Sequence, residues 1–187
     1  MKHTLVALVQ DKPGVLNRVA SLFRRRNFNI ESLTVGHTDQ PHVSRMTIVI
    51  DSDNTSAHLV EANLAKLVNV IDIQDVTDQE TISRDLALIK VRVDAAGRAE
   101  IAQLAEIFRA KIVDVATDSV VVEVTGDEDK IDGLVELLRP KGILEMVRTG
   151  RISMVRGNQA RKSTNGYSNG NGHGNGHVTR DVGASSV

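Results

Sequence analysis

The sequence contains no cysteine and no tryptophan, and its aromatic residues are limited to three Phe and one Tyr. Without cysteine the chain can form no disulfide, no thiolate nucleophile and no thiolate-ligated zinc or iron–sulfur site. With so few aromatic rings it cannot build the stacking platforms that commonly bind single-stranded nucleic acid. Because nothing indicates an oxidising compartment, we expect the protein to be cytoplasmic.

An excess of charge and long hydrophobic runs are also missing. Lys and Arg number 23 against 24 Asp and Glu, which gives a net charge of −1 over 187 residues. This balance supplies no general attraction to phosphate, and no apolar stretch approaches the roughly 20 residues of a membrane span. We therefore expect neither nucleic acid nor a membrane as a partner. The 41% hydrophobic and 25% charged content is that of a globular protein.

The composition changes after Gly157. Residues 158–187 are rich in Gly, Asn, Ser and His and have almost no periodic apolar residues, which predicts a disordered tail. Before it, the apolar spacing predicts the order strand, helix, strand, strand, helix, strand, twice over. The first series has strands at 3–10, 30–37, 43–51 and 70–76 and helices at 15–26 and 56–68. The second has strands at 86–93, 112–116, 120–124 and 143–147 and helices around 101–108 and 131–138, the latter ended by Pro140 and Gly142.

This order predicts an α+β fold of two successive ferredoxin-like βαββαβ units, each a four-stranded antiparallel sheet with two helices on one face. We assign residues 1–78 to the first unit, 79–84 to a linker and 85–157 to the second unit. Each sheet would leave one bare face and exposed edges rich in Val and Ile. Units should therefore pair side by side or face to face, and we expect at least a dimer.

The sequence carries none of the common catalytic motifs. It has no Walker loop, no GxSxG, no HExxH, and no GxGxxG between a strand and a helix. The close pair His173 and His177 lies in the Gly-rich tail, where glycine disfavours the helix that metal ligation at this spacing would need. We expect no catalytic residue, metal site or cofactor on this chain.

The segment Asp11-Lys12-Pro13-Gly14-Val15-Leu16 joins the first predicted strand to the first predicted helix. Asp11 can cap the helix, Pro13 presets its first turn, and Gly14 lets a ligand approach the backbone closely. The N–H groups of Gly14, Val15 and Leu16 would then face outward at the positive end of the helix dipole, which suits a carboxylate. An ordinary capped strand-to-helix turn is the alternative that these residues leave open.

Two further segments follow this loop, Asn29-Ile30-Glu31-Ser32-Leu33-Thr34-Val35 and Ser44-Arg45-Met46-Thr47-Ile48. Together the three resemble the regulatory (small) subunits of acetolactate synthase, also called acetohydroxyacid synthase. The D-x-P-G-x-L loop alone marks only the wider ACT family of amino-acid-sensing domains, and the other two segments are more specific. Residues 106–109, 112–115 and 150–152 agree with the same family, so the resemblance covers residues 1 to about 157.

The resemblance implies an N-terminal ACT domain, a C-terminal ferredoxin-like domain and no chemistry on this chain. In that family the small subunit binds a separate thiamine-diphosphate-dependent catalytic subunit, which also carries Mg and FAD. It raises the activity of that subunit and confers feedback inhibition by valine in the biosynthesis of valine, leucine and isoleucine. The effector would lie between the ACT domains of a homodimer, held by loop 11–16 of one chain and by Asn29 and Ile30 of the other.

The chemistry of these residues suits the implied roles. The loop N–H groups can bind the effector carboxylate, Asp11 can accept from its ammonium group, and Asn29 can both donate and accept. An aliphatic lining would favour a branched side chain, since each buried methylene contributes about 0.8 kcal/mol. The predicted effector-binding residues are Asp11, Gly14, Val15, Leu16, Asn29 and Ile30. The alternative function is a free-standing ACT-type regulator of another enzyme or of transcription, although no helix-turn-helix pattern is present.

Overall fold

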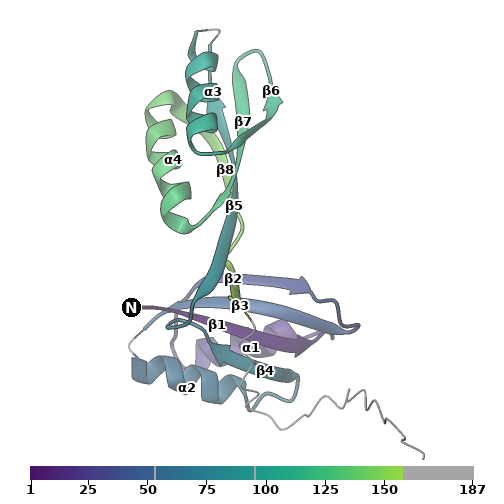
Figure 1. The fold of residues 1–187 in the computed structure, drawn as a ribbon. Coiled ribbons are helices and arrows are strands. Elements are labelled where there is room, and N and C mark those ends of the chain that lie inside the picture. The colour runs from purple at the N-terminus through teal and green to yellow at the C-terminus, as the bar shows by residue number, and fades with distance from the viewer. Residues whose placement is uncertain (53, 95, 158–187) are drawn as a thin grey trace, which may run out of the picture.

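The computed structural model describes residues 1–52, 54–94 and 96–157, and it places two α/β units at opposite ends of an elongated molecule (Figure 1). The first unit comprises β1 (Lys2–Gln10), α1 (Val15–Arg25), β2 (Ile30–His37), β3 (Val43–Asp51), α2 (Asn54–Leu64) and β4 (Val70–Asp75). The second comprises β5 (Thr81–Arg92), α3 (Gly97–Ile107), β6 (Lys111–Val115), β7 (Ser119–Gly126), α4 (Glu128–Gly142), β8 (Ile143–Arg148) and β9 (Ile152–Val155). The predicted tail lies outside the described residues. In the described part of the chain, no helix is long and apolar enough to cross a membrane.

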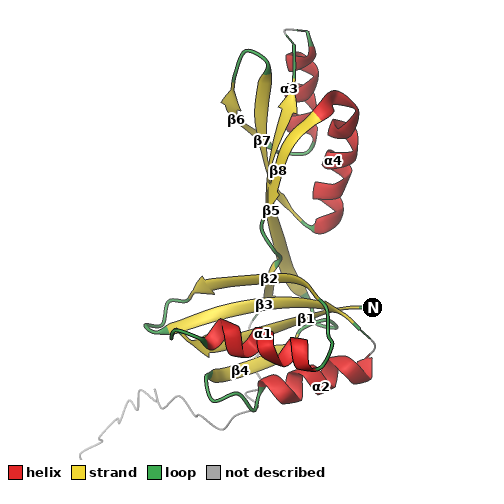
Figure 2. Cartoon of the chain, turned by 180° about the vertical axis from the view of Figure 1, so that it is seen from behind, coloured by secondary structure: helices red, strands yellow, loops and turns green. Residues whose placement is uncertain are grey.

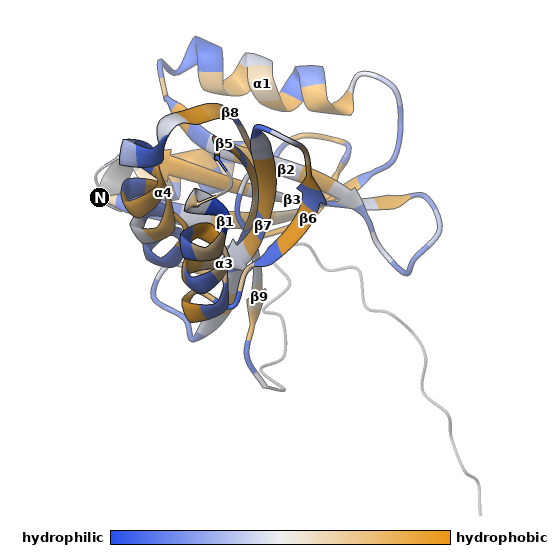
Figure 3. Cartoon of the chain, turned by 90° about the horizontal axis from the view of Figure 1, so that it is seen from above, coloured by the Kyte–Doolittle hydropathy of each residue, from blue (hydrophilic) through white to orange (hydrophobic). Residues whose placement is uncertain are grey.

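The first unit is an antiparallel sheet in the order β2-β3-β1-β4, with α1 and α2 on one face (Figure 2). Alternate residues of β1 point toward the helices, because strand side chains repeat every two residues. On α1 the buried residues are Val15, Val19 and Phe23, spaced four apart on one side of the helix. Figure 3 shows the resulting alternation of apolar and polar residues along α1. The core therefore lies between the sheet and its two helices.

The second unit repeats this topology with the order β6-β7-β5-β8 and with α3 and α4 on one face. Its core is a separate cluster that includes Ile89, Val122 and Leu134, all fully buried. The start of α4 is capped by the side chain of Asp127, which accepts a hydrogen bond of 3.2 Å from the backbone N–H of Lys130. The predicted pair of ferredoxin-like units is confirmed.

Several predicted boundaries are wrong. Residues 81–84, assigned to the linker, form the beginning of β5, and β9 was not predicted at all. Helix α2 begins two residues earlier than expected and ends at Leu64, four residues earlier. Helix α4 begins at Glu128, three residues earlier than expected. It runs through Pro140 in its last turn and ends at Gly142 as predicted, where φ is +93° and glycine carries no Cβ penalty.

The first four residues of β5 pair antiparallel with β9 to form a two-stranded ribbon, which lies against the helix-free face of the N-terminal sheet. Arg45 of β3 donates from Nη2 to the backbone oxygen of Ser153 in β9 at 2.6 Å. The N–H of Arg151 donates to Ser32 Oγ of β2 at 3.0 Å. Thr47 on this face is only 2% exposed. The expected bare face of the first unit is thus partly covered by the chain itself.

Candidate functional site

The loop between β1 and α1 exposes the beginning of the helix. Gly14 is the N-cap residue, with φ +83° and ψ −6°, and no protein atom lies within 4 Å of the position that a Cβ would occupy. No side chain caps α1, and its first turn contains no acidic residue. The positive end of the helix dipole therefore has no anionic partner among the described residues, which is the arrangement that an anionic ligand requires.

The N–H groups of this turn are largely unused. The N–H of Val15 donates to the oxygen of Lys12 in a long bond of 3.3 Å, whereas those of Gly14 and Leu16 make no backbone hydrogen bond within the described residues. Such donors are satisfied by water or by a ligand. Two N–H groups of the loop, those of Gly14 and Leu16, therefore remain available to a ligand, beside the weakly bonded N–H of Val15.

The predicted apolar lining is only partly available. The side chain of Val15 is 5% exposed and packs in the core, so Val15 can serve a ligand only through its backbone. Leu16 is 46% exposed beside the loop and is free to contact an aliphatic group. Ile30 is partly buried against the core of its own unit.

Asn29 and Ile30 do not meet the loop within one chain. Ile30 pairs with Ile50 at one end of β3, whereas Gln10, just before the loop, pairs with Val43 at the other end. The sheet therefore separates the two halves of the predicted site by the length of a strand. They can come together only if two chains contribute.

One residue beside the loop was not predicted from the sequence. His37, at the end of β2, places Nδ1 3.5 Å from Asp11 Oδ2, and the N–H of Asp11 donates to the oxygen of His42 at 2.8 Å. The backbone bond holds the start of the loop beside the turn before β3, and the exposed side chain of His37 lies next to Asp11. Only the register of β1, β3 and β2 brings His37 near Asp11, so local sequence carried no signal for it.

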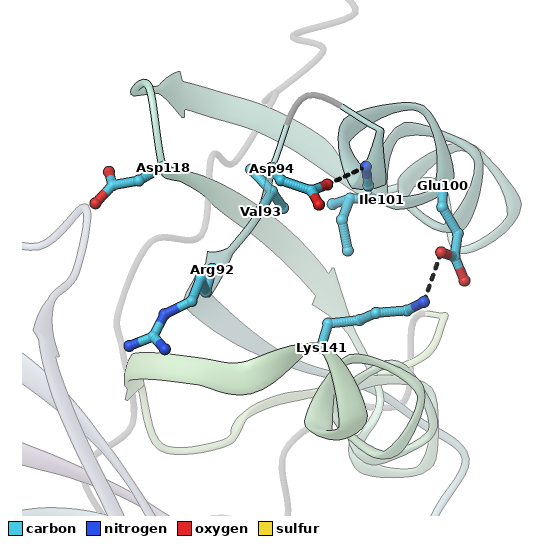
Figure 4. Close-up of a pocket in the computed structure, with 8 residues that line it drawn as sticks. Arg92, Val93, Asp94, Glu100, Ile101, Asp118 and Lys141 are labelled. Atoms are coloured by element: carbon cyan, nitrogen blue, oxygen red, sulfur yellow. Dashed lines mark hydrogen bonds and ion pairs between the residues drawn. The ribbon is translucent and has the colours of Figure 1, made fainter.

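The corresponding position of the second unit differs. There the loop from β5 to α3 borders a cavity of about 490 Å³ (Figure 4). Asp94 Oδ1 accepts from the N–H of Gly97 at 2.7 Å, so a carboxylate of the chain itself already occupies the start of α3. Across the cavity, Lys141 Nζ lies 2.5 Å from Glu100 Oε2. Among the described residues, carboxylates of the chain therefore bind the starts of α3 and α4, whereas none does so at the start of α1.

The fold of the first unit is that of an ACT domain, and residues 5–72 match the family described as "AHAS small subunit-like ACT domain". Residues 84–157 match the family "Small subunit of acetolactate synthase". The chain belongs to the acetolactate synthase small-subunit family.

Individual relatives agree over nearly their whole length. The chain is 52% identical over 159 residues to the probable acetolactate synthase small subunit of Archaeoglobus fulgidus, covering 85% of this chain and 99% of the relative. It is 49% identical over 155 residues to the acetolactate synthase small subunit of Mycolicibacterium smegmatis, covering 83% and 91%. The crystal structure of the small subunit from Thermotoga maritima is 40% identical, covers 85% of this chain and 99% of that one, and superposes with a TM-score of 0.79.

Proposed function

We propose that this chain is the cytoplasmic regulatory subunit of acetolactate synthase. It binds a separate catalytic subunit, which would hold thiamine diphosphate, Mg and FAD, and raises its activity. It also makes that enzyme sensitive to valine, the end product of a branched-chain amino-acid pathway. Membership of the small-subunit family is the observation that carries the first part. The uncapped start of α1 supports the second.

A homodimer through the ACT domains would complete the effector site. β2 is an edge strand, and within the described residues it pairs only with β3. If β2 paired antiparallel with β2 of a second copy, the Ile30 end of one strand would lie beside the His37 end of the other. Since His37 contacts Asp11, Asn29 and Ile30 of one chain would then approach the loop of its partner. This supports valine binding between two chains.

Valine would act by shifting the equilibrium between two arrangements of the subunits. It needs only to bind one arrangement of the subunits more tightly than another, and a typical coupling of about 1–3 kcal/mol changes activity about 5- to 150-fold.

Reconstitution with the catalytic subunit tests the proposal. Acetolactate formation is measured with the catalytic subunit alone, with this chain added, and with this chain plus valine. We expect higher activity on addition of the chain and inhibition when valine is present. If the reconstituted enzyme shows no activation and no valine sensitivity, the proposal is wrong. Activation without valine sensitivity would support the assignment as a regulatory subunit but contradict the proposed binding of valine.

A further inference from the structure

A cavity lies between the N-terminal sheet and the ribbon formed by β9 and the start of β5. Its volume is about 360 Å³, and its walls include Thr34 and Thr47 from the sheet and Ser153 from the ribbon. This volume is in the range of small-molecule sites. None of the six predicted effector residues lines it, although His37, which contacts Asp11 of the loop between β1 and α1, borders both regions.

One wall of the cavity is strongly apolar. Ile82, Ile152 and Met154 line it, and their exposed fractions are 42%, 54% and 64%. Single exposed apolar residues are ordinary on protein surfaces, but several that converge on one concave surface indicate a binding site. An aliphatic group placed here would remove all three side chains from water.

The ionisable side chains of the cavity are all basic. Arg45, Arg84 and His37 line it, and no Asp or Glu does so among the described residues. A backbone carbonyl holds each guanidinium group: Arg45 Nη2 donates to Ser153 at 2.6 Å, and Arg84 Nη1 donates to Ser83 at 2.6 Å. Positioned guanidinium groups favour carboxylates.

We propose that this cavity binds a small branched aliphatic carboxylate, with its alkyl group against Ile82, Ile152 and Met154 and its carboxylate toward Arg45 and Arg84. One wall belongs to the ACT domain and the other to the ribbon that continues into the second unit. A ligand bound here would therefore contact the ACT domain and the ribbon at once. The binding does not depend on a catalytic partner.

Methionine-methyl NMR tests the binding step. The chain has four Met residues, and Met154 alone lines the cavity, whereas Met146 lies in β8 of the second unit and is 45% exposed. With 4-methylpentanoate as the probe, we expect a saturable shift of the Met154 methyl signal and none at Met146. The alcohol 4-methylpentan-1-ol, which has the same alkyl group without the charge, should bind about tenfold more weakly. Equal binding of acid and alcohol would overturn the proposal.

Variants of the full chain separate this site from other surfaces. Arg84→Gln should weaken the probe about tenfold, and Arg92→Gln, at the far end of β5, should leave its binding unchanged. Gly14→Asp should also leave it unchanged, because that residue lies in the other site. An unaffected Arg84→Gln variant, or a parallel shift of Met146, would contradict the proposal. So would a Met154 shift that follows protein concentration rather than probe concentration, since a second copy would then cover the cavity.

Discussion

Among single residues, Gly14 determines whether the start of α1 can meet a ligand. Its φ of +83° is a left-handed conformation, which costs most other residues roughly 1–2 kcal/mol. Because no atom lies within 4 Å of its missing Cβ, the space beside it is open to an effector. A side chain introduced there enters the proposed binding space without displacing the protein.

A negative charge at this position should strongly weaken the response to valine. In Gly14→Asp the new carboxylate would lie where the effector carboxylate binds, and like charges in contact repel strongly. We expect half-inhibition of the reconstituted enzyme to need more than about tenfold more valine, with activation retained. Gly14→Asn is the matched control, because Asn has nearly the same shape and tolerates positive φ without a charge. Valine inhibition curves of the two variants should differ clearly; a fully sensitive Asp variant would remove Gly14 from the site.

Among the elements, strand β5 connects the first unit to the second. Its first four residues pair with β9, and the rest pairs with β7 and β8 in the second sheet. One continuous strand thus passes from the ACT domain surface into the second unit. The two units are joined by hydrogen-bonded structure where the sequence suggested a polar linker.

Local sequence predicts an element when the element's own residues show the full apolar repeat of a helix or a strand. Helix α1 and strand β3 have such spacing and were placed to within one residue. β9 has four residues and acquires its partner from a distant segment, as the side-chain hydrogen bond between Ser83 and Ser153, 70 residues apart, illustrates. His37 was not predicted as a site residue for the same reason, since pairing between distant strands brings it near Asp11. The loop at Gly14 was predictable because its turn chemistry is local.

The connection between β8 and β9 passes β2 at Gly150. A Cβ there would lie 2.5 Å from Thr34 Oγ1 and 2.6 Å from Ser32 Oγ. Gly150→Ala should therefore push the connection away from β2 and lower the free energy of unfolding by about 1–3 kcal/mol. Gly36→Ala in β2 is the control, since nothing lies within 4 Å of its Cβ, and its effect should stay within about 0.5 kcal/mol. Urea unfolding measures both, and equal losses would contradict this account.

At the scale of the whole molecule, a small network of charges joins the two units. Lys2 Nζ of β1 lies 2.6 Å from Glu31 and 2.9 Å from Glu128, the first residue of α4. Arg151 Nη2 lies 2.5 Å from the other carboxylate oxygen of Glu128. The hydrogen bond from Lys2 lowers the pKa of Glu128 below its usual 4.5, and hydrogen bonds to Glu31 and Glu128 raise the pKa of Lys2. The start of α4 is thereby tied to the first strand of the ACT domain.

The lowered pKa of Glu128 predicts how this connection depends on pH. A carboxyl group whose pKa is lower in the folded state adds stability above its unfolded pKa and loses it as pH falls through the folded value. Glu128→Gln should therefore lower the free energy of unfolding at pH 7 by about 0.5–1 kcal/mol, the range of a partly exposed ion pair. At a pH well below 4.5, where the wild-type carboxyl gains its proton, the difference between the two proteins should shrink. Urea unfolding at both pH values measures this, with Glu136→Gln, an exposed residue of the same helix, as the control. A difference that stays constant with pH would show that Glu128 stabilises the molecule by packing rather than by charge.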